Sequence, residues 1–288
     1  MKKEKISLYI PCYNSEKYIN ECLKGIMNQT YPIDEILVID DGSNDSTAYI
    51  ASKYPVKFIT NSENKGLAAS RNIAFRESKN NFVVALDADC VPEPDWLEKL
   101  IKDLMDETVT GSGGMLIEKY HLNSADKWRG IHLQQHWGKN IIYNPPFLYG
   151  CNTIFKKNHI KEIGLYNEFY RNNNEDVDLS QRLLKNGYNL IYNPNAIVEH
   201  IRRDTVISII TTSWKWFFWG LPVPDKMKNI FSKTIRNFRK SISFLSNDIK
   251  NKYFSLLLID ILFPFYHILL DFKFYKNKHT NGYNKNNN

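Results

Sequence analysis

Short apolar runs alternate with amphipathic segments in the first part of the chain. The runs occupy positions 6–10, 36–39, 56–59 and 82–86. Runs of this length indicate strands that are buried on both faces, as in a parallel sheet. Between them, apolar side chains recur at helical spacing. The predicted helices cover residues 15–27, capped by Asn14 or Ser15, residues 46–54, capped by Asp45 or Ser46, and residues 66–78, and a fourth starts at Pro94.

Strands that alternate with helices predict right-handed βαβ units. The fold class expected for residues 1–203 is therefore α/β, with a mostly parallel sheet flanked by helices. Ligands of such sheets bind beyond the carboxyl ends of the strands. Residues 204–275 differ in character and are predicted to form a helical extension. Residues 276–288 are rich in Asn and Lys and are expected to be disordered.

Polar residues follow each of the four predicted strands. They are Tyr13 and Asn14, then Asp40 and Asp41, then Asn61 to Asn64, then Asp87 and Asp89. Because the carboxyl ends of parallel strands meet at one edge, these four segments converge on one rim. Carboxylates at the ends of buried strands are costly unless they meet a cation or hydrogen-bond donors. The rim is therefore the expected ligand site.

The segment Asp87-Ala88-Asp89 suits a divalent metal. On an extended segment, side chains two residues apart point to the same side, so both carboxylates can face one site. Oxygen ligands of this kind suit Mg²⁺ or Mn²⁺, with a substrate diphosphate completing the coordination shell. A solvated turn is the alternative interpretation of this short motif.

Two further motifs suit a nucleotide. In Asp40-Asp41-Gly42-Ser43-Asn44-Asp45-Ser46-Thr47, a carboxylate can accept hydrogen bonds from a base or a ribose, although a turn and helix cap would use the same residues. The segment 64–72, NKGLAASRN, begins a helix, and a helix N-terminus favours anionic groups. Arg71 could reach a phosphate from there, or could be a surface arginine.

Taken in order, these motifs resemble glycosyltransferase family 2. The resemblance continues at residues 150–157, GCNTIFKK, at residues 175–183, EDVDLSQRL, and from Tyr192 to His200, and it covers about residues 5–200. It implies a GT-A fold and an inverting transfer from a nucleotide-sugar, with UDP as the expected nucleotide and Mn²⁺ or Mg²⁺ as the cofactor. The residues that it assigns to the nucleotide-sugar are Pro11, Tyr13, Asn14, Asp41, Asn64, Gly66, Arg71, Asp87, Ala88 and Asn152.

The resemblance also implies metal and catalytic residues. Asp89, with Asp87, would hold the metal, and Asp176 would be the general base, with Glu175 beside it as the less favoured candidate. His200 is either a further metal or phosphate ligand or a hydrogen-bonded histidine at the domain edge. The residues His121, His132, His136 and His159 show no ligand spacing.

The sequence disfavours related activities. Gln134-Gln135-His136-Trp137 lacks the arginine of the Q-x-x-R-W signature of processive members and precedes Asp176, so a non-processive enzyme is expected. A nucleotidyltransferase would carry a Gly-rich, Arg-containing loop after the first strand, and a dehydrogenase a G-x-G-x-x-G motif. A scaffold that binds without turnover is disfavoured because Asp41, Asp89 and Asp176 are all present.

Charge separates the two parts of the chain. Residues 1–200 carry 23 basic and 26 acidic residues, a net charge of −3, whereas residues 201–288 carry 15 and 5, a net charge of +10. The second part contains an aromatic cluster, Trp214, Trp216, Phe217, Phe218 and Trp219, and a basic amphipathic segment over residues 226–241. Its apolar run at 254–270 is short for a membrane span and contains Pro264.

These features predict helices that lie on a membrane surface, with packing on the catalytic domain as the alternative. Nucleic acid is not an expected partner. The four cysteines show no C-x-x-C spacing and suit a reducing compartment. No signal peptide is recognisable, so the expected location is the cytoplasm, at the inner face of the membrane. The acceptor is expected to be a surface glycan or a lipid-linked glycan.

Overall fold

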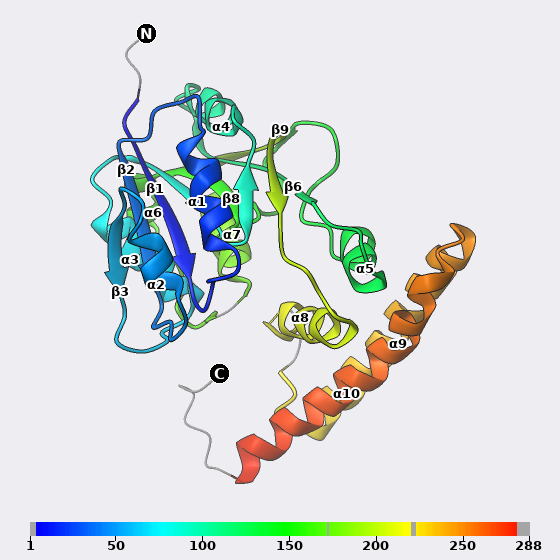
Figure 1. Ribbon diagram of the computed structural model, residues 1–288. Helices are drawn as coiled ribbons and strands as arrows, with labels where there is room; N and C mark the ends of the chain where they lie inside the picture. Colours follow the sequence, from blue (N-terminus) through cyan, green and yellow to red (C-terminus); the bar gives the residue numbers. More distant parts are fainter. Residues whose placement is uncertain (1–3, 172, 220–222, 281–288) are drawn as a thin grey trace. The chain divides into compact units, whose positions relative to one another are not determined.

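The computed structural model describes residues 4–171, 173–219 and 223–280 (Figure 1). The chain divides into two compact units. The first unit comprises Met1–Lys119 and Gln135–Arg202, and the second comprises Tyr120–Gln134 and Arg203–Asn288. The second unit thus begins at Arg203 but also takes in Tyr120–Gln134, which the sequence analysis assigned to the catalytic domain.

The first unit is built on one sheet. Among the described residues it has nine strands, in the order β3-β2-β1-β4-β8-β6-β9-β5, with β7 paired to β9. Its first half is parallel and consists of β1 (Ile6–Cys12), β2 (Glu35–Asp40), β3 (Lys57–Thr60) and β4 (Phe82–Leu86). The four predicted strands are therefore confirmed, with small shifts at their ends.

The other half of the sheet has mixed pairing. Its strands are β5 (Cys90–Pro92), β6 (Val109–Glu118), β7 (Ile142–Tyr143), β8 (Asn152–Lys156) and β9 (Asn189–His200). β8 runs antiparallel to β4 and β6, whereas β6 and β9 are parallel. The first half therefore follows the predicted βαβ pattern, and the second half does not.

The predicted helices of the first unit are present with shifted ends. They are α1 (Ile19–Met27), α2 (Thr47–Ala51), α3 (Leu67–Glu77) and α4 (Trp96–Leu104). α1 begins later than predicted because the Ser15 carbonyl accepts from the Tyr18 and Ile19 amides, which makes a turn there instead of a side-chain cap. The Asp45 carboxylate accepts from the Thr47 amide at 3.0 Å at the start of α2, as a cap residue would.

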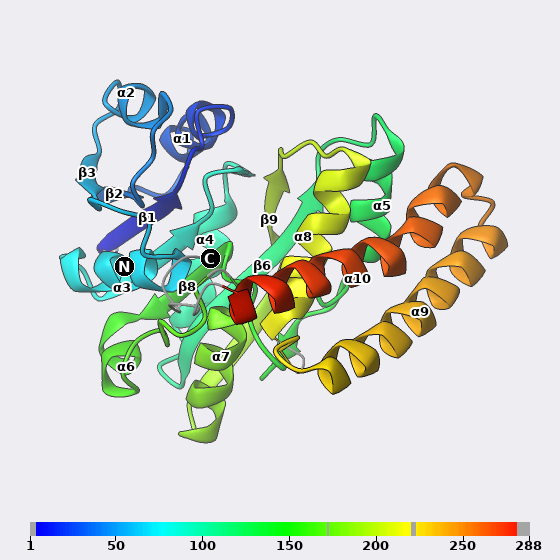
Figure 2. The same cartoon turned by 90° about the horizontal axis from the view of Figure 1, so that it is seen from below.

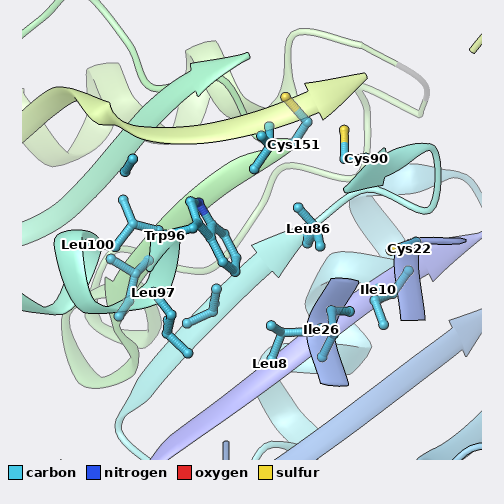
Figure 3. Packing of buried hydrophobic residues seen from close by; sticks show 14 of the residues in the cluster. Leu8, Ile10, Cys22, Ile26, Leu86, Cys90, Trp96, Leu97, Leu100 and Cys151 are labelled. Carbon is cyan, nitrogen blue, oxygen red and sulfur yellow. The ribbon is translucent and has the colours of Figure 1, made fainter. Parts of the chain in front are cut away.

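Two apolar clusters cover the faces of the sheet. One cluster contains Leu8, Ile10, Ile26, Leu86 and Trp96, and Figure 3 shows these side chains turned toward one another. The other contains Tyr9, Phe75 and residues of α7 (Glu175–Lys185), and α6 (Lys157–Glu162) contributes Ile160. The four cysteines are buried and free, in agreement with the predicted reduced thiols.

The second unit is helical. It contains α5 (Ser124–His132), α8 (Val206–Trp219), α9 (Met227–Lys250), the short turn η1 (Phe254–Leu256) and α10 (Leu257–Thr280). α9 and α10 run side by side as a hairpin (Figure 2). The core of this unit includes Trp128, Ile209, Leu256, Ile259 and Phe263.

Two predictions about the end of the chain need correction. Lys276 to Thr280 continue α10 instead of being disordered, and Lys278 pairs with Asp225 at 3.3 Å, whereas residues 281–288 lie outside the described part. The apolar run is also longer than expected. Among the described residues, the segment Phe254–His279 is the one helix long and apolar enough to cross a membrane, with a mean hydropathy of 1.7, because Pro264 lies within the helix without ending it.

Candidate active site

Asp41 organises the loop that follows β3. Its Oδ1 accepts from the Asn61 side chain at 2.7 Å and from the Lys65 amide at 2.9 Å, and its Oδ2 accepts from the Gly66 amide at 2.8 Å. Asp41 is buried, so these bonds compensate for the loss of water around its charge. The carboxylate predicted to contact the nucleoside therefore also fixes the segment that leads into α3.

Gly66 permits a close approach at the same place. Its φ is +98°, a left-handed conformation that favours glycine, and an added Cβ would lie 2.7 Å from the Arg171 carbonyl oxygen. The Leu67 amide donates to that same carbonyl at 2.5 Å. The start of α3 is thus joined to the segment that precedes α7, and so to Glu175 and Asp176.

The segment Asp87-Ala88-Asp89 forms a turn between β4 and β5. The Cys90 amide donates to the Asp87 carbonyl at 3.0 Å, so the predicted extended geometry is wrong. Ala88 is buried, whereas the side chains of Asp87 and Asp89 remain 28% and 26% exposed. Burial raises the pKa of Asp87, and nearby Asp89 adds to this effect while Arg71 opposes it. The carboxylates of Asp87 and Asp89 are therefore close enough to repel each other, but a turn and not the predicted extended segment brings them together.

Arg71 connects the two groups of carboxylates. Its Nη2 lies 3.0 Å from Asp87 Oδ1, and its Nε lies 3.3 Å from Glu175 Oε1 without the angle of a hydrogen bond. Its Nη1 donates to the Gly150 carbonyl at 2.7 Å and to the Tyr9 hydroxyl at 3.3 Å. The side chain is 1% exposed, so the expectation that Arg71 reaches a phosphate is not met in this structure. Its guanidinium instead holds protein carboxylates in place.

Glu175 and Asp176 begin α7 in different environments. Glu175 is buried, its Oε2 has no hydrogen-bond partner, and burial with the neighbouring Asp176 charge raises its pKa to about 8. Asp176 is less buried, and its two oxygens accept from the Gly150 amide at 2.9 Å and the Val177 amide at 2.8 Å. Burial raises the pKa of Asp176 as well, but these backbone bonds favour its ionised form. The ionised form that a base needs is therefore better supported by hydrogen bonds at Asp176 than at Glu175.

Gly150 allows this arrangement because it has no side chain. An added Cβ would lie 3.0 Å from Arg71 Nη2 and 3.2 Å from Asp176 Cβ. The backbone at this position donates to Asp176 and accepts from Arg71. One glycine therefore holds the candidate base and the buried arginine close together.

His200 lies between two carboxylates at the end of β9. Its Nδ1 is 2.7 Å from Glu118 Oε2, and its Nε2 is 3.3 Å from Asp89 Oδ2. Burial would lower the pKa of His200, but Asp89 and Glu118 outweigh burial and raise the pKa to about 9. His200 was expected to be either a metal or phosphate ligand or a hydrogen-bonded histidine at the domain edge. The structure shows both of its ring nitrogens hydrogen-bonded, with Nε2 directed at Asp89.

The same residues fit a divalent metal. Carboxylate oxygens and an imidazole nitrogen are ligands that Mn²⁺ accepts, and Asp89 Oδ2 and His200 Nε2 are already neighbours. A carboxylate bound to the far nitrogen of a histidine ligand is the usual arrangement in metal sites, and Glu118 occupies that position. Asp89 and His200, with Asp87 nearby, are the residues that would hold the ion.

The other predicted nucleotide-sugar residues occupy different places. Asn152 is fully buried, and its amide bonds the Trp96 indole, the Met115 carbonyl and the Ala196 carbonyl. The prediction that it contacts the donor is therefore corrected, because its side chain is fully used in the core. Pro11 lies within β1 and is buried.

The remaining three predicted donor residues are exposed. Tyr13, Asn14 and Asn64 all face solvent at the carboxyl ends of the parallel strands. Asn14 has a φ of +50°, and its side-chain oxygen accepts from the Asn44 amide, while its own amide donates to Ser43. The loops after β1 and β2 are joined in this way at the predicted rim.

Sequence reasoning missed residues that only the fold brings to the site. Tyr9 and Glu118 come from strands whose pattern indicates core, and the sequence carries no signal for their roles beyond a polar end on a buried strand. In the second unit, His132, Asp248 and Asp260 place ligand atoms within 4.8 Å of one another. The sequence shows no ligand spacing around His132, because these partners are more than a hundred residues away.

Comparison with known proteins identifies the family. Residues 7–164 match the family model for glycosyl transferase family 2. The glycosyltransferase AglE of Haloferax volcanii is 26% identical over 215 residues, which cover 69% of this chain and 67% of AglE. Across four curated relatives, the chain spans between 32% and 67% of the relative's length.

Solved structures show the same fold. The chain superposes on Staphylococcus aureus TarS 1-349 in complex with UDP-GlcNAc with a TM-score of 0.56 and 21% identity, covering 70% of this chain and 59% of that one. It superposes on the mannosyltransferase PcManGT from Pyrobaculum calidifontis, in complex with GDP-Man and Mn²⁺, with a TM-score of 0.55 and 18% identity. That match covers 97% of this chain and 76% of PcManGT. The predicted GT-A fold is confirmed.

Proposed function

Because the chain belongs to glycosyltransferase family 2, we propose that it moves one sugar from a nucleotide-sugar to an acceptor hydroxyl with inversion of configuration. The observation that carries this proposal is the link made by Arg71. The guanidinium contacts Asp87, on the side predicted to bind the donor, and Glu175, next to the candidate base. Donor and acceptor groups are thus held at one place by a single buried side chain.

The donor would bind at the rim formed by Asp41, Asp87 and Asp89. Asp41 fixes the loop from Asn61 to Gly66, and the exposed Tyr13 and Asn14 lie at the end of the neighbouring strand. Asp89 and His200, with Asp87, would hold a divalent ion, which supplies positive charge to the departing diphosphate when bound. Mn²⁺ or Mg²⁺ is the proposed cofactor, and PcManGT was solved with Mn²⁺.

Asp176 is the proposed general base. Its ionised carboxylate would accept the proton of the acceptor hydroxyl as that oxygen attacks the anomeric carbon. A single displacement needs the attacking oxygen and the departing diphosphate on opposite faces of the sugar. Asp176 begins α7, whereas Asp89 follows β4, so the two carboxylates come from separate segments of the chain. The bonds from Gly150 and Val177 would fix the Asp176 carboxylate during this step.

The donor and acceptor classes are also proposals. We propose a UDP-sugar, which agrees with the UDP-GlcNAc bound by TarS, although PcManGT holds GDP-Man and makes GDP-sugars the alternative. The acceptor would be a surface glycan or a lipid-linked glycan that receives one sugar per encounter. The proposed location is the cytoplasmic face of the membrane.

A donor panel tests this proposal. Full-length protein is incubated with UDP-, GDP- and dTDP-sugars and Mn²⁺, and free nucleoside diphosphate is measured with and without excess EDTA. We expect turnover of one nucleotide class, lost in EDTA and lost in Asp176→Asn. Release of a nucleoside monophosphate or pyrophosphate would contradict the proposed transfer. Full activity in excess EDTA would contradict the proposed metal requirement.

A further inference from the structure

The α9–α10 hairpin has its polar side chains inside. Ionisable and polar residues are buried along the inner sides of both helices. They are Lys233, Asn237, Ser241 and Asp248 of α9, and Asp260, His267 and Asp271 of α10. Most of them are paired within the unit, for example Lys233 Nζ with Asp271 Oδ1 at 2.7 Å and Trp128 Nε1 with Asp260 Oδ1 at 2.7 Å. The hairpin is therefore held together by polar contacts as well as by the apolar cluster around Phe263.

The outer sides of the same helices carry exposed apolar residues. The exposed apolar residues of α9 recur at spacings of four or seven and are Met227, Phe231, Ile235, Ile242 and Ile249. Those that follow α9, in η1 and α10, are Phe254, Leu258, Ile261, Leu262, Phe265, Leu269 and Phe272. Such spacings place each set on one side of its helix. These two sets of residues are called the apolar rows below.

The two rows meet. Phe238, which lies in the row of α9 by its spacing, contacts the ring of Phe265 at 5.4 Å between centroids. α9 and α10 are also packed against each other along the hairpin (Figure 2). The rows therefore form one extended apolar surface, and an exposed surface of this kind marks a contact with another apolar phase or protein.

The charged residues next to the apolar rows indicate what kind of apolar surface the rows contact. Lys228, Arg239 and Lys250 are exposed and lie eleven residues apart, which is close to three helical turns, so they line one side of the α9 row. Lys273 is exposed near the end of the α10 row. The net charge of residues 201–288 is +10. An apolar surface flanked by lysine and arginine complements the acyl chains and negative headgroups of an anionic bilayer.

The inner polar groups decide how deep the hairpin lies. α10 is long and apolar enough to cross a membrane, but Asp260, His267 and Asp271 lie on its inner side among partners from other helices. A span would carry these groups through the bilayer centre at a cost of several kcal/mol. We propose that the α9–α10 hairpin instead lies in the interface of an anionic phospholipid bilayer, with the apolar rows embedded and the flanking basic residues at the headgroups.

This inference is independent of the proposed sugar transfer and is tested without it. Full-length protein is mixed with vesicles of phosphatidylcholine containing phosphatidylglycerol and then floated on a density gradient at low salt. The row variant carries Phe231→Ser, Ile242→Ser and Leu258→Ser, three positions that are 68%, 64% and 61% exposed. The control variant carries Ile117→Ser, Ile141→Ser and Tyr143→Ser, which are exposed in the first unit.

We expect the parent and the control variant to float with the vesicles and the row variant to bind at least about tenfold more weakly. The flank variant replaces the basic residues beside the α9 row and carries Lys228→Gln, Arg239→Gln and Lys250→Gln. On anionic vesicles, the loss of each of these positive charges should weaken binding by about fivefold. This flank variant should behave like the parent on phosphatidylcholine alone.

Three results would overturn the proposal. The parent protein could fail to float at low salt, or the row variant could float as well as the control variant. Alternatively, light scattering without vesicles could show an oligomer that the row variant dissociates, which would assign the rows to a contact between copies of this chain. Unchanged circular dichroism and donor turnover in the variants exclude unfolding as the cause of lost binding.

Discussion

The two units of this chain differ in where their charged side chains lie. In the first unit, strands such as β1 and β4 are almost entirely apolar and buried, and the charged residues of the site lie at strand ends and at the start of α7. In the second unit, α9 and α10 bury Lys233, Asp248 and Asp271 and expose phenylalanine and isoleucine. Both units nevertheless contain ion pairs with a buried cation at similar distances, Arg71–Asp87 at 3.0 Å and Lys233–Asp271 at 2.7 Å.

This difference shows that an ion pair with a buried cation serves different purposes in the two units. In the first unit, Arg71 joins Asp87, which is partly exposed, to Glu175, which is buried, and both belong to the candidate site. In the second unit, the polar contacts join helices whose outer sides are apolar. These contacts hold the hairpin together alongside the apolar cluster around Phe263.

The largest effect is expected from Asp176→Asn, which keeps the shape of the side chain and removes the proton acceptor. Turnover should fall by roughly 10²–10⁴-fold, the range typical of a positioned general base. Donor affinity should change little because the proposed nucleotide and metal contacts are made by Asp41 and Asp89. Single-turnover transfer and donor calorimetry measure the two quantities.

Glu175→Gln is the matched control for the base and should cost less, because burial and the neighbouring Asp176 charge raise the pKa of Glu175 and disfavour the ionised form that a base needs. If Asp176→Asn keeps near-normal transfer while Glu175→Gln abolishes it, the base is Glu175. If both variants keep transfer, the acceptor is activated elsewhere.

Arg71→Met should destabilise the first unit by about 3–5 kcal/mol, because it leaves the Asp87 carboxylate without its cation and the Gly150 carbonyl without its donor. Arg76→Met is the control on the same helix. Arg76 is 56% exposed and lies 3.9 Å from Glu168, and its loss should cost less than about 1 kcal/mol. Urea denaturation followed by fluorescence compares the two variants. Equal losses would show that Arg71 is not the organising residue inferred here.

Lys233→Met should destabilise the second unit by a similar amount, about 3–5 kcal/mol, because it leaves Asp271 charged and buried. The double variant Lys233→Met with Asp271→Leu should recover most of this loss, since no uncompensated charge remains. Thermal unfolding monitored by tryptophan fluorescence is a suitable measurement because Trp214 donates to Asp271 at 2.8 Å. A double variant no more stable than the single one would argue against this charge effect.

Asp89→Ala should weaken donor binding by about 10–100-fold in the presence of Mn²⁺, the usual effect of disturbing a metal site. Without metal, the donor affinities of the parent and the variant should be nearly equal. Calorimetry with and without EDTA measures this difference. A loss of affinity that is the same in both conditions would show that Asp89 acts on the donor without a metal.

The smallest expected effect is a shift in pH dependence. Burial raises the pKa of Asp176, and a base must be ionised to act, so kcat/KM should decline as the pH falls through this raised pKa. The acid limb should therefore lie above the usual range for an aspartate and should level off at higher pH. A profile that stays flat down to the ordinary aspartate pKa would contradict the burial effect.

The sequence predicted the parallel half of the sheet better than the other half. The runs that became β1, β2, β3 and β4 are local and apolar, and each is separated from the next by a helical pattern. β8 was not predicted as an antiparallel partner of β4 because nothing in Asn152–Lys156 encodes that pairing. Strand neighbours are chosen by contacts between distant segments, which a pass along the chain does not reveal.

By itself, the sequence determined the alternation of strands and helices, the carboxylates at the strand ends, the family and the basic character of residues 201–288. These properties depend on residue type and short spacing. Only the tertiary structure decided that Arg71 is buried against Asp87 and Glu175, that Asn152 is a core residue and that Glu118 supports His200. It also decided that α9 and α10 bury their polar sides. Burial and pairing arise from segments that can be more than a hundred residues apart, so the environment that sets each side chain's charge exists only after folding.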